Sequence, residues 1–254
     1  MSITDTYLEN VSEGIRRIRE EQRENIEAAG RACAKSIAGD GLAFTFGTGH
    51  GGFAALECFP RTGTPVGFRP IVETAISNFH HVLGDQGAYQ YRFLHALEGY
   101  GVAILRAHQL EPGDTMVLFS HSGINPVILD MALRSKELGM TVVGVTSIPH
   151  SSAVPARHSS GQRLFEAADI VIDTGVPLSD ASVPVEGLDH PVGPTSTVLA
   201  TAVAHALVGE TVQELVRLGR RPFVMVNPNT AGREEANLLN DENYRELWRV
   251  LRSR

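Results

Sequence analysis

The chain has 254 residues, of which 43% are hydrophobic, so it can bury one substantial core and one domain is the expected organisation. Its net charge of -7, without a sustained basic stretch, argues against nucleic acid or an anionic membrane surface as a partner. Only two cysteines, a polar start and no apolar run of about 18 residues predict a protein of the reducing cytoplasm rather than a secreted or membrane protein.

Residues from about Thr4 to Gly39 place apolar side chains at helical spacing among many charges. The pattern predicts one long N-terminal helix with a narrow apolar stripe. Such a helix buries little surface alone, so we expect it to pack across the body of the protein or against a second subunit. The sequence is accordingly divided into this helix (1–40), an α/β core (41–218) and a C-terminal strand and helix (219–254).

A short buried strand, Leu42 to Phe46, is expected to lead into a glycine-rich loop and then into a helix through Glu57. The loop is formally a G-x-G-x-x-G fingerprint, and Glu73 follows at about the distance of a ribose-binding acid. A dinucleotide site is therefore one alternative. The long preceding helix and a second, serine-rich loop favour a phosphate-plus-sugar site. The first loop reads Gly47-Thr48-Gly49-His50-Gly51-Gly52.

The next segment mixes one strand, one loop and one helix. Val66 to Val72 has the pattern of a second strand. Ser77 to Gly87 is polar, carries the paired His80 and His81, and is expected to be a loop near the site. Tyr89 to Leu110 has a helical pattern with a weak point at Gly99-Tyr100-Gly101.

The apolar strand Thr115 to Phe119 runs into small hydroxyl residues and then into a helix, Pro126 to Leu138. Two serine hydroxyls, a glycine that lets the backbone come close, an asparagine cap and the positive end of the helix predict an anion cradle. The loop lacks the Gly-Lys-Ser/Thr ending of a nucleotide triphosphate site, so a phosphorylated metabolite is the better expectation. The alternative is an ordinary strand-to-helix turn. This loop reads Ser120-His121-Ser122-Gly123-Ile124-Asn125.

Further strands are expected at Thr141 to Thr146 and Ile170 to Asp173, so the alternation of strands and helices implies a parallel sheet. Between them, Ser147 to Gly161 is a polar excursion that is too long for a plain connection. The remaining expected elements are a long helix, a strand and a charged helix, at Thr195 to Leu218, Pro222 to Val226 and Arg233 to Arg254.

Both loops are expected at the carboxyl ends of parallel strands, where they would form one pocket. Glu57 could act there as a general base that abstracts a proton alpha to a carbonyl, or it could be a surface glutamate. His205 shares a face of its helix with Thr197 and Thr201, and could be a catalyst or a satisfied core histidine. The hydroxyls of Thr195 to Thr197 could bind a ligand or simply cap this helix.

The ten histidines do not form a recognisable metal site, because no H-x-x-x-H pair or Cys/His cluster has ligand spacing. Neither a metal nor a redox cofactor is therefore expected. Two histidine-bearing segments, Arg157 to Gly161 and Gly187 to His190, are loops of the kind that can close over a ligand.

Taken together, these motifs resemble the SIS (sugar isomerase) family, and in particular its bacterial phosphosugar-binding members. The resemblance implies a flavodoxin-like five-stranded parallel sheet flanked by helices, a homodimer or homotetramer, and a pocket often completed by a neighbouring subunit. The segments that carry it are Phe46 to His50, Glu57, Ser120 to Asn125, Arg157 to Gly161, Val171 to Asp173 and Gly193 to Thr197.

Two enzyme groups of this superfamily share residues with the chain. Phosphoheptose isomerases use an acid/base pair at the places matched here by Glu57 and His205, with a glutamine where this chain has Thr197. The N-acetylmuramate-phosphate etherases resemble the Glu-Cys-x-Pro sequence that starts at Glu57, and Glu98 is a loose match for their second glutamate. The resemblance thus implies a phosphosugar ligand, with aldose-ketose isomerisation through an enediol as the leading reaction. Ether elimination and non-catalytic sensing are the alternatives.

The chain departs from its relatives at His121 and Thr174, where asparagine is usual in the family. A regulator of the RpiR type would need a helix-turn-helix domain of about 80 residues before the core, and about 40 residues are available. The residues expected to contact the phosphosugar are Gly47, Thr48, Gly49, His50, Ser120, His121, Ser122, Gly123, Asn125, Thr195, Ser196 and Thr197, with Glu98, His158 and Ser159 as accessory candidates.

Overall fold

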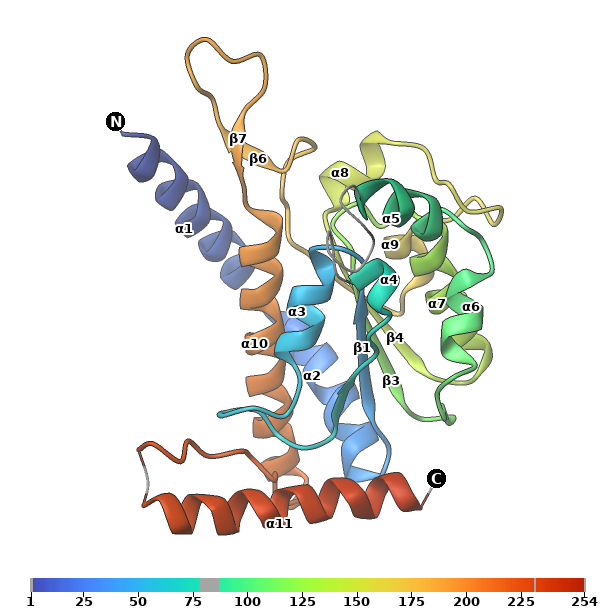
Figure 1. Cartoon of the computed structure of the whole chain (residues 1–254), viewed down its shortest axis with the longest axis vertical. Coiled ribbons are helices and arrows are strands. Elements are labelled where there is room, and N and C mark those ends of the chain that lie inside the picture. The colour runs from blue at the N-terminus through green and yellow to red at the C-terminus, as the bar shows by residue number, and fades with distance from the viewer. Residues whose placement is uncertain (1, 78–86, 231, 254) are drawn as a thin grey trace.

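The computed structural model describes residues 2–77, 87–230 and 232–253. Its centre is a five-stranded parallel sheet with the strand order β2-β1-β3-β4-β5, which confirms the predicted flavodoxin-like α/β fold (Figure 1). The inner strands β1 and β3 are buried along their whole length, and β4 is buried at all but its first residue, because helices cover both faces of the sheet. The strands are β1 (Ala43–Gly47), β2 (Phe68–Pro70), β3 (Thr115–Phe119), β4 (Thr141–Thr146) and β5 (Ile170–Asp173).

The order of the strands places a switch point between β1 and β3. These two strands pair in parallel, with Thr45 beside Val117 and Gly47 beside Phe119, but the chain continues from them toward opposite edges of the sheet. In open α/β sheets, the crevice at the carboxyl ends of such a strand pair is where ligands bind. The two loops that the sequence singled out follow β1 and β3 directly.

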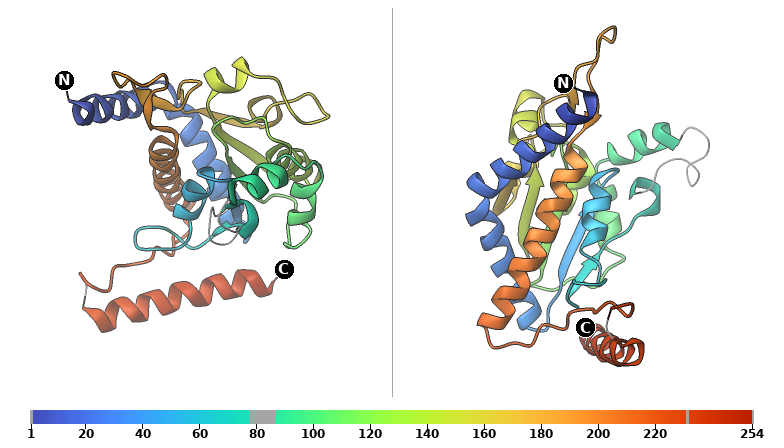
Figure 2. Two further views of the ribbon diagram at one scale, coloured as in Figure 1. Left: turned by 45° about the horizontal axis from the view of Figure 1, so that its top comes forward. Right: turned by 90° about the vertical axis from the view of Figure 1, so that its left-hand side faces the viewer.

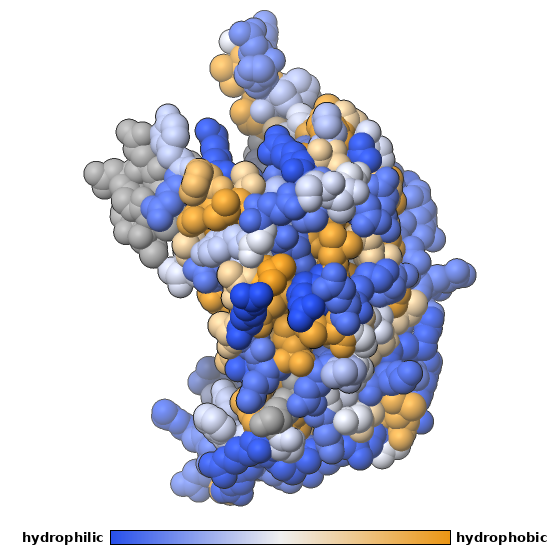
Figure 3. Space-filling view, turned by 90° about the vertical axis from the view of Figure 1, so that its right-hand side faces the viewer, coloured by the Kyte–Doolittle hydropathy of each residue, from blue (hydrophilic) through white to orange (hydrophobic). Residues whose placement is uncertain are grey.

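One face of the sheet is covered by α2 (Arg23–Ala38), α3 (Gly51–Glu57) and α10 (Ser196–Arg217), whose buried residues share one apolar cluster with the sheet (Figure 2). The other face is covered by α6 (Tyr100–Leu105), α7 (Pro126–Glu137) and α9 (Leu164–Ala167). The outer surface on the α6 and α7 side mixes hydrophobic patches with hydrophilic residues (Figure 3).

The N-terminal region is two helices rather than the single helix predicted from Thr4 to Gly39. The long helix α1 (Ile3–Glu21) is separated from α2 by Gln22, which is the C-cap of the first helix and the N-cap of the second. Here the Gln22 side-chain oxygen accepts the Asp173 N–H at 3.1 Å and the Asn25 amide at 3.0 Å. The break is thus stabilised by a contact with β5. As expected, both helices pack across the body, chiefly against α10.

The predicted helix from Tyr89 to Leu110 is also divided, into α5 (Gly87–His95) and α6. The division lies at the predicted weak point, because Gly99 adopts a left-handed conformation (φ 90°) and precedes α6. A short helix, α4 (Thr74–Ser77), precedes the segment with His80 and His81, which lies outside the described residues.

The polar excursion from Ser147 to Gly161 begins with a helix, α8 (Ile148–Ala153). A two-stranded antiparallel hairpin of β6 (Ala181–Val183) and β7 (Val192–Pro194) was not predicted. The segment Pro222 to Val226 is not a regular strand. It bonds to residues 63–66 through backbone groups but forms only an isolated bridge there.

The C-terminal helix α11 (Arg233–Arg252) was predicted from its charge pattern and is present. It lies crosswise at the end of the molecule where the strands begin, far from their carboxyl ends (Figures 1 and 2). Within the described ranges, none of the helices is both long enough and apolar enough to span a bilayer.

Candidate functional site

A cavity of about 190 Å³ lies at the carboxyl ends of β1 and β3, at the switch point of the sheet. Both loops singled out in the sequence contribute to it, together with the start of α10. The cavity is lined by Thr48, His50, Gly51, Tyr91, Phe119, Ser120, His121, Ser122, Asn125, Val145, Thr174, Asp180, Ser196, Thr197 and Ala200.

The glycine-rich loop lets α3 start very close to the end of β3. A Cβ atom on Gly51 would lie 2.4 Å from the backbone oxygen of Phe119, so only glycine fits without displacing the backbone. Gly49 has a positive φ of 56°, which turns the loop toward α3. Thr48 is buried against the cavity and its hydroxyl bonds the Tyr91 side chain. The loop therefore contributes a threonine, a histidine and close backbone contact to one wall, whereas Gly47 and Gly49 shape the loop without lining the cavity.

The serine-rich loop forms a concave group of backbone donors. Gly123 has a positive φ of 61°, and its N–H donates to the Ser120 hydroxyl at 3.1 Å. Among the residues that the structure describes, the N–H groups of Ser122, Ile124 and Asn125 donate to no acceptor. These free N–H groups lie on both sides of Gly123, whose own N–H is engaged, and they resemble the backbone nests that bind anions in other proteins; the start of α7 adds its positive dipole end.

Asn125 occupies the N-cap position of α7 but does not cap that helix with its side chain, contrary to the prediction. Its amide nitrogen donates to the Ser122 hydroxyl at 3.4 Å, and its amide oxygen accepts from Arg157 at 3.1 Å. Because the Asn125 side chain bonds Ser122 and Arg157, it does not occupy the N–H groups at the start of α7; Pro126 has no N–H, and Ile128 and Leu129 donate to the Asn125 carbonyl oxygen.

The third wall of the cavity is built around Asp180, which the sequence analysis missed. Its carboxylate accepts the N–H groups of Thr195 at 3.0 Å and Ser196 at 2.8 Å, and the Ser196 hydroxyl at 2.7 Å. Asp180 therefore caps α10, and Thr195, which was expected to contact the ligand, does not line the cavity. Ser196 and Thr197 do line it. The sequence signal was weak, an aspartate after a serine in a short polar turn. In the structure, Asp180 adopts a positive φ of 60°.

His121 pairs with His150 of α8 behind the serine-rich loop. The two ring centroids are 4.4 Å apart at 69°, and both ring nitrogens of His121 are buried without a hydrogen-bond partner among the described residues. Burial lowers the pKa of His121 from 6.5 to about 4, and it also lowers the pKa of His150. His121 is therefore a neutral imidazole in the wall of the cavity.

The predicted acid/base residues lie together but outside the cavity. The His205 Nε2 atom is 3.2 Å from a Glu57 carboxylate oxygen, and Arg61 also pairs with Glu57. The two side chains are 47% and 34% exposed. Glu57 follows Gly51 by six residues, so it lies about 9 Å along α3 from the cavity. Glu57 and His205 thus contact each other on the shared surface of α3 and α10.

The accessory candidates Glu98, His158 and Ser159 also lie outside the cavity, where they hold the Arg157 to Gly161 segment in place. The Ser159 N–H donates to Glu98 at 3.0 Å, and the His158 Nε2 atom is 3.3 Å from an Asp130 carboxylate oxygen of α7.

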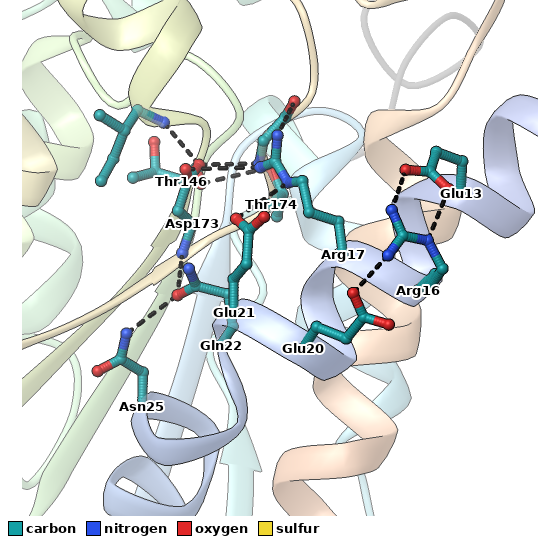
Figure 4. A network of polar contacts seen from close by, with 12 residues as sticks. Glu13, Arg16, Arg17, Glu20, Glu21, Gln22, Asn25, Thr146, Asp173 and Thr174 are labelled. Atoms are coloured by element: carbon teal, nitrogen blue, oxygen red, sulfur yellow. Dashed lines mark hydrogen bonds and ion pairs between the residues drawn. The ribbon is translucent and has the colours of Figure 1, made fainter.

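The wall that contains Thr174 is braced by the N-terminal helix (Figure 4). Arg17 of α1 lies 3.5 Å from the Asp173 carboxylate and donates to the Gly175 backbone oxygen at 3.1 Å. The Asp173 carboxylate also accepts the N–H groups of Ile148 and Gly175. Helix α1 therefore restrains the chain on both sides of Thr174.

The described residues include two cysteines but no cluster of metal-ligating side chains. In the described ranges, no three His, Cys, Asp or Glu side chains are grouped so that they could hold a metal ion. Cys33 and Cys58 are buried free thiols, and burial raises the pKa of Cys33 to about 12. These thiols belong to the apolar core rather than to the cavity.

Comparison with known proteins gives a consistent family and fold. A family model described as the SIS domain matches residues 6–147. A UPF0309 protein of Shouchella clausii is 34% identical over 237 residues, which cover 93% of this chain and 94% of that protein. Among solved structures, a phosphoheptose isomerase from Francisella tularensis has a TM-score of 0.55 at 16% identity, covering 84% of this chain and all of that one. The Vibrio vulnificus NanR protein complexed with ManNAc-6P has a TM-score of 0.51 at 14% identity, covering 86% of this chain and 65% of that one.

Proposed function

The chain belongs to the SIS domain family, and from this premise we propose that it binds a phosphorylated sugar in the cavity at the switch point. The observation that carries the proposal is the set of unengaged N–H groups at Ser122, Ile124 and Asn125, beside the hydroxyls of Ser120 and Ser122. Backbone N–H groups and hydroxyls at a helix N-terminus suit the oxygens of a phosphate group.

The sugar moiety would extend from the phosphate toward the glycine-rich loop and the start of α10. Thr48, His50 and Thr197 offer polar side chains on these two walls. A few convergent polar groups in a pocket of this kind fix the orientation of a ligand. Ser120, Ser122 and Asn125 would hold the phosphate, and the Thr48 and His50 side would hold the hydroxyls.

Aldose-ketose isomerisation is the leading reaction, and it is supported by the 3.2 Å contact between Glu57 and His205. The Glu57 carboxylate would take the proton from the carbon next to the carbonyl, giving an enediol, and would return it to the former carbonyl carbon. His205 would assist ring opening or the transfer of the hydroxyl proton. Because Glu57 lies about 9 Å along α3 from Gly51, the sugar would have to extend from the phosphate along this helix for its reacting carbons to reach the carboxylate.

A homo-oligomer would make this pair more effective as a catalyst. Phe53, Leu56 and Phe59 are exposed apolar side chains on and just after α3, beside Glu57. Exposed apolar groups clustered in this way favour association. A second copy of the chain that covered them would exclude water from the Glu57–His205 pair, and a desolvated carboxylate is a stronger base. We therefore include a homodimer or homotetramer in the proposal.

The alternatives differ in what they require of the acid/base residues. A phosphosugar sensor is favoured by the position of Glu57 and His205 outside the cavity, and a fold neighbour, NanR, is complexed with ManNAc-6P. Elimination of an ether would need a second glutamate near the ligand. Glu98 is bound to Ser159 and does not line the cavity, which disfavours that reaction.

The first experiment is a thermal-shift screen with pairs of phosphorylated and free sugars. We expect the phosphorylated member of at least one pair to raise the unfolding temperature and the free sugar to leave it unchanged. Ser122→Ala should remove this discrimination. If no sugar phosphate shifts the wild-type protein, the proposed ligand class is wrong.

The second experiment separates isomerase from sensor. The sugar phosphate that binds is incubated in deuterium oxide, and proton NMR follows both conversion and entry of deuterium at the carbon next to the carbonyl. Glu57→Gln should abolish both while binding persists. Glu137→Gln, which changes an exposed glutamate of α7 paired with Arg134, is the matched control and should leave them intact. Binding without deuterium entry in the wild type would establish the sensor instead.

A further inference from the structure

Arg157 is attached to the serine-rich loop through both its backbone and its side chain. Its N–H donates to the Ile124 carbonyl oxygen at 3.2 Å, and its guanidinium donates to the Asn125 amide oxygen at 3.1 Å. These two acceptors belong to the last two residues before α7. The serine-rich loop itself contains no lysine or arginine. Arg157 therefore brings a positive charge to this loop from a segment more than 30 residues further along the chain.

The segment that carries Arg157 is fixed by the residues that follow it. The His158 side chain is 9% exposed and contacts the Asp130 carboxylate, whose other oxygen accepts the N–H groups of Gly99 at 2.7 Å and Gly101 at 3.1 Å. The Ser159 N–H donates to Glu98. Arg157 is therefore presented by a segment tied to α7 and to the start of α6, and its position does not depend on a ligand.

The charge of Arg157 has no counter-charge among the described residues. The side chain is exposed and pairs with no carboxylate in the described ranges. Among the described residues, its side-chain hydrogen bond goes to a neutral amide, so other N–H groups of the guanidinium are left without a described acceptor. Arg157 is not a lining residue of the cavity and lies at its rim, against Asn125. Its positive charge also contributes to the lowered pKa of the neighbouring His95, although burial is the larger cause.

The contact with Arg157 also fixes how Ser122 presents its hydroxyl. A guanidinium has only donors, so the amide of Asn125 must turn its oxygen toward Arg157 and its nitrogen toward Ser122. The Ser122 oxygen then accepts a hydrogen bond, and its own proton is free to donate to an anion in the cavity. The chain of bonds runs from Arg157 through Asn125 to Ser122.

We propose that Arg157 is the cationic partner of the anion site, supplying charge to a bound phosphate and orienting the Ser122 hydroxyl through Asn125. The proposal rests on the proposed function, because it assumes that the cradle binds a phosphate. It adds a residue outside both loop motifs and predicts that affinity depends on ionic strength, because an exposed guanidinium is screened by salt.

The test is a titration with inorganic phosphate, followed by thermal shift at low and high sodium chloride at pH 7.5. Arg157→Lys keeps the charge, Arg157→Gln keeps a donor for Asn125 without the charge, and Arg157→Ala removes both. Arg217→Gln removes an exposed charge, paired with Glu214, at the far end of α10 and serves as the control for a change of net charge. Thermal unfolding without phosphate checks that each variant is folded.

We expect Arg157→Lys to bind within about threefold of the wild type, Arg157→Gln to bind about tenfold more weakly with a smaller salt dependence, and Arg157→Ala to be weakest. Arg217→Gln should match the wild type. Wild-type affinity and salt dependence in the Gln variant would overturn the role of Arg157 and leave the proposed function intact. Absence of phosphate binding by the wild type would overturn both.

Discussion

Replacing His121 by asparagine should remove a large part of the acid sensitivity of the fold. The histidine ring is enclosed between His150 and the loop that carries Asp180, and its nitrogens reach neither solvent nor a hydrogen-bond partner among the described residues. In the folded protein, protonation of His121 is therefore opposed by the loss of hydration and by the neighbouring His150. It is favoured by the negative charge of Asp180.

The size of the effect follows from the two pKa values of His121. In the unfolded chain the group has its ordinary pKa of 6.5, and in the folded protein burial lowers that pKa to about 4. Because the folded pKa is the lower one, the unfolded state binds more protons between these values and stability is lost as the pH falls. One pKa unit corresponds to about 1.36 kcal/mol. The protonation of His121 alone therefore lowers the free energy of unfolding by about 2 kcal/mol between pH 7 and pH 5.

The assay is urea unfolding followed by circular dichroism at pH 7, 6 and 5 for the wild type and His121→Asn. The free energy of unfolding should fall by about 2 kcal/mol less in the variant over this range, since the other titrating groups, His150 included, are present in both proteins. His190→Asn, at an exposed position in the hairpin, should follow the wild type. Equal losses in the wild type and His121→Asn would refute the assignment of a neutral, buried imidazole.

Three other substitutions, two of them with a control, test the packing at the cavity and in the core beneath α10. Gly51→Ala places a Cβ atom 2.4 Å from a carbonyl oxygen at the end of β3, and should cost about 2 kcal/mol in urea unfolding and weaken phosphate binding. Gly209→Ala lies in the interior of α10, where the new Cβ atom meets nothing within 4 Å, and it should be neutral or up to about 1 kcal/mol stabilising. A Gly209→Ala protein less stable than Gly51→Ala would contradict the reasoning. Asp180→Ala removes the cap of α10 and should lower stability by about 1 to 2 kcal/mol in thermal unfolding; an unchanged midpoint would show that the cap is dispensable. Leu207→Ala empties a fully buried site and should cost about 2 to 5 kcal/mol, whereas the exposed Val216→Ala should cost little, as urea unfolding of both would reveal.

The sheet could be predicted because its strands are short apolar runs with clear boundaries. β3, β4 and β5 have the predicted bounds, and each lies between turn residues or a helix start. The break between α1 and α2 could not be predicted, because helical spacing continues across Gln22 and the break depends on its contact with Asp173. The β6–β7 hairpin was missed because strands of three residues carry too little pattern.

The candidate site was predictable to the extent that it is local in sequence. A strand, a small-residue loop and a helix start can be read directly, and the two loops identified in this way line one cavity. Asp180, Tyr91 and Arg157 reach the site or its rim only through the packing of segments that are distant along the chain. Their residue types alone do not distinguish them from other polar surface groups.

The contact between Arg17 and Asp173 has a consequence for how the protein acquires its shape during synthesis. The two residues are separated by 156 positions, so at about 5 to 20 residues per second the ribosome needs roughly 10 to 30 s to make the second after the first. Until then the nascent chain carries α1 without the carboxylate that anchors it. Helix α1 thus docks long after it has been made, and the wall around Thr174 takes its final form only when that docking is complete.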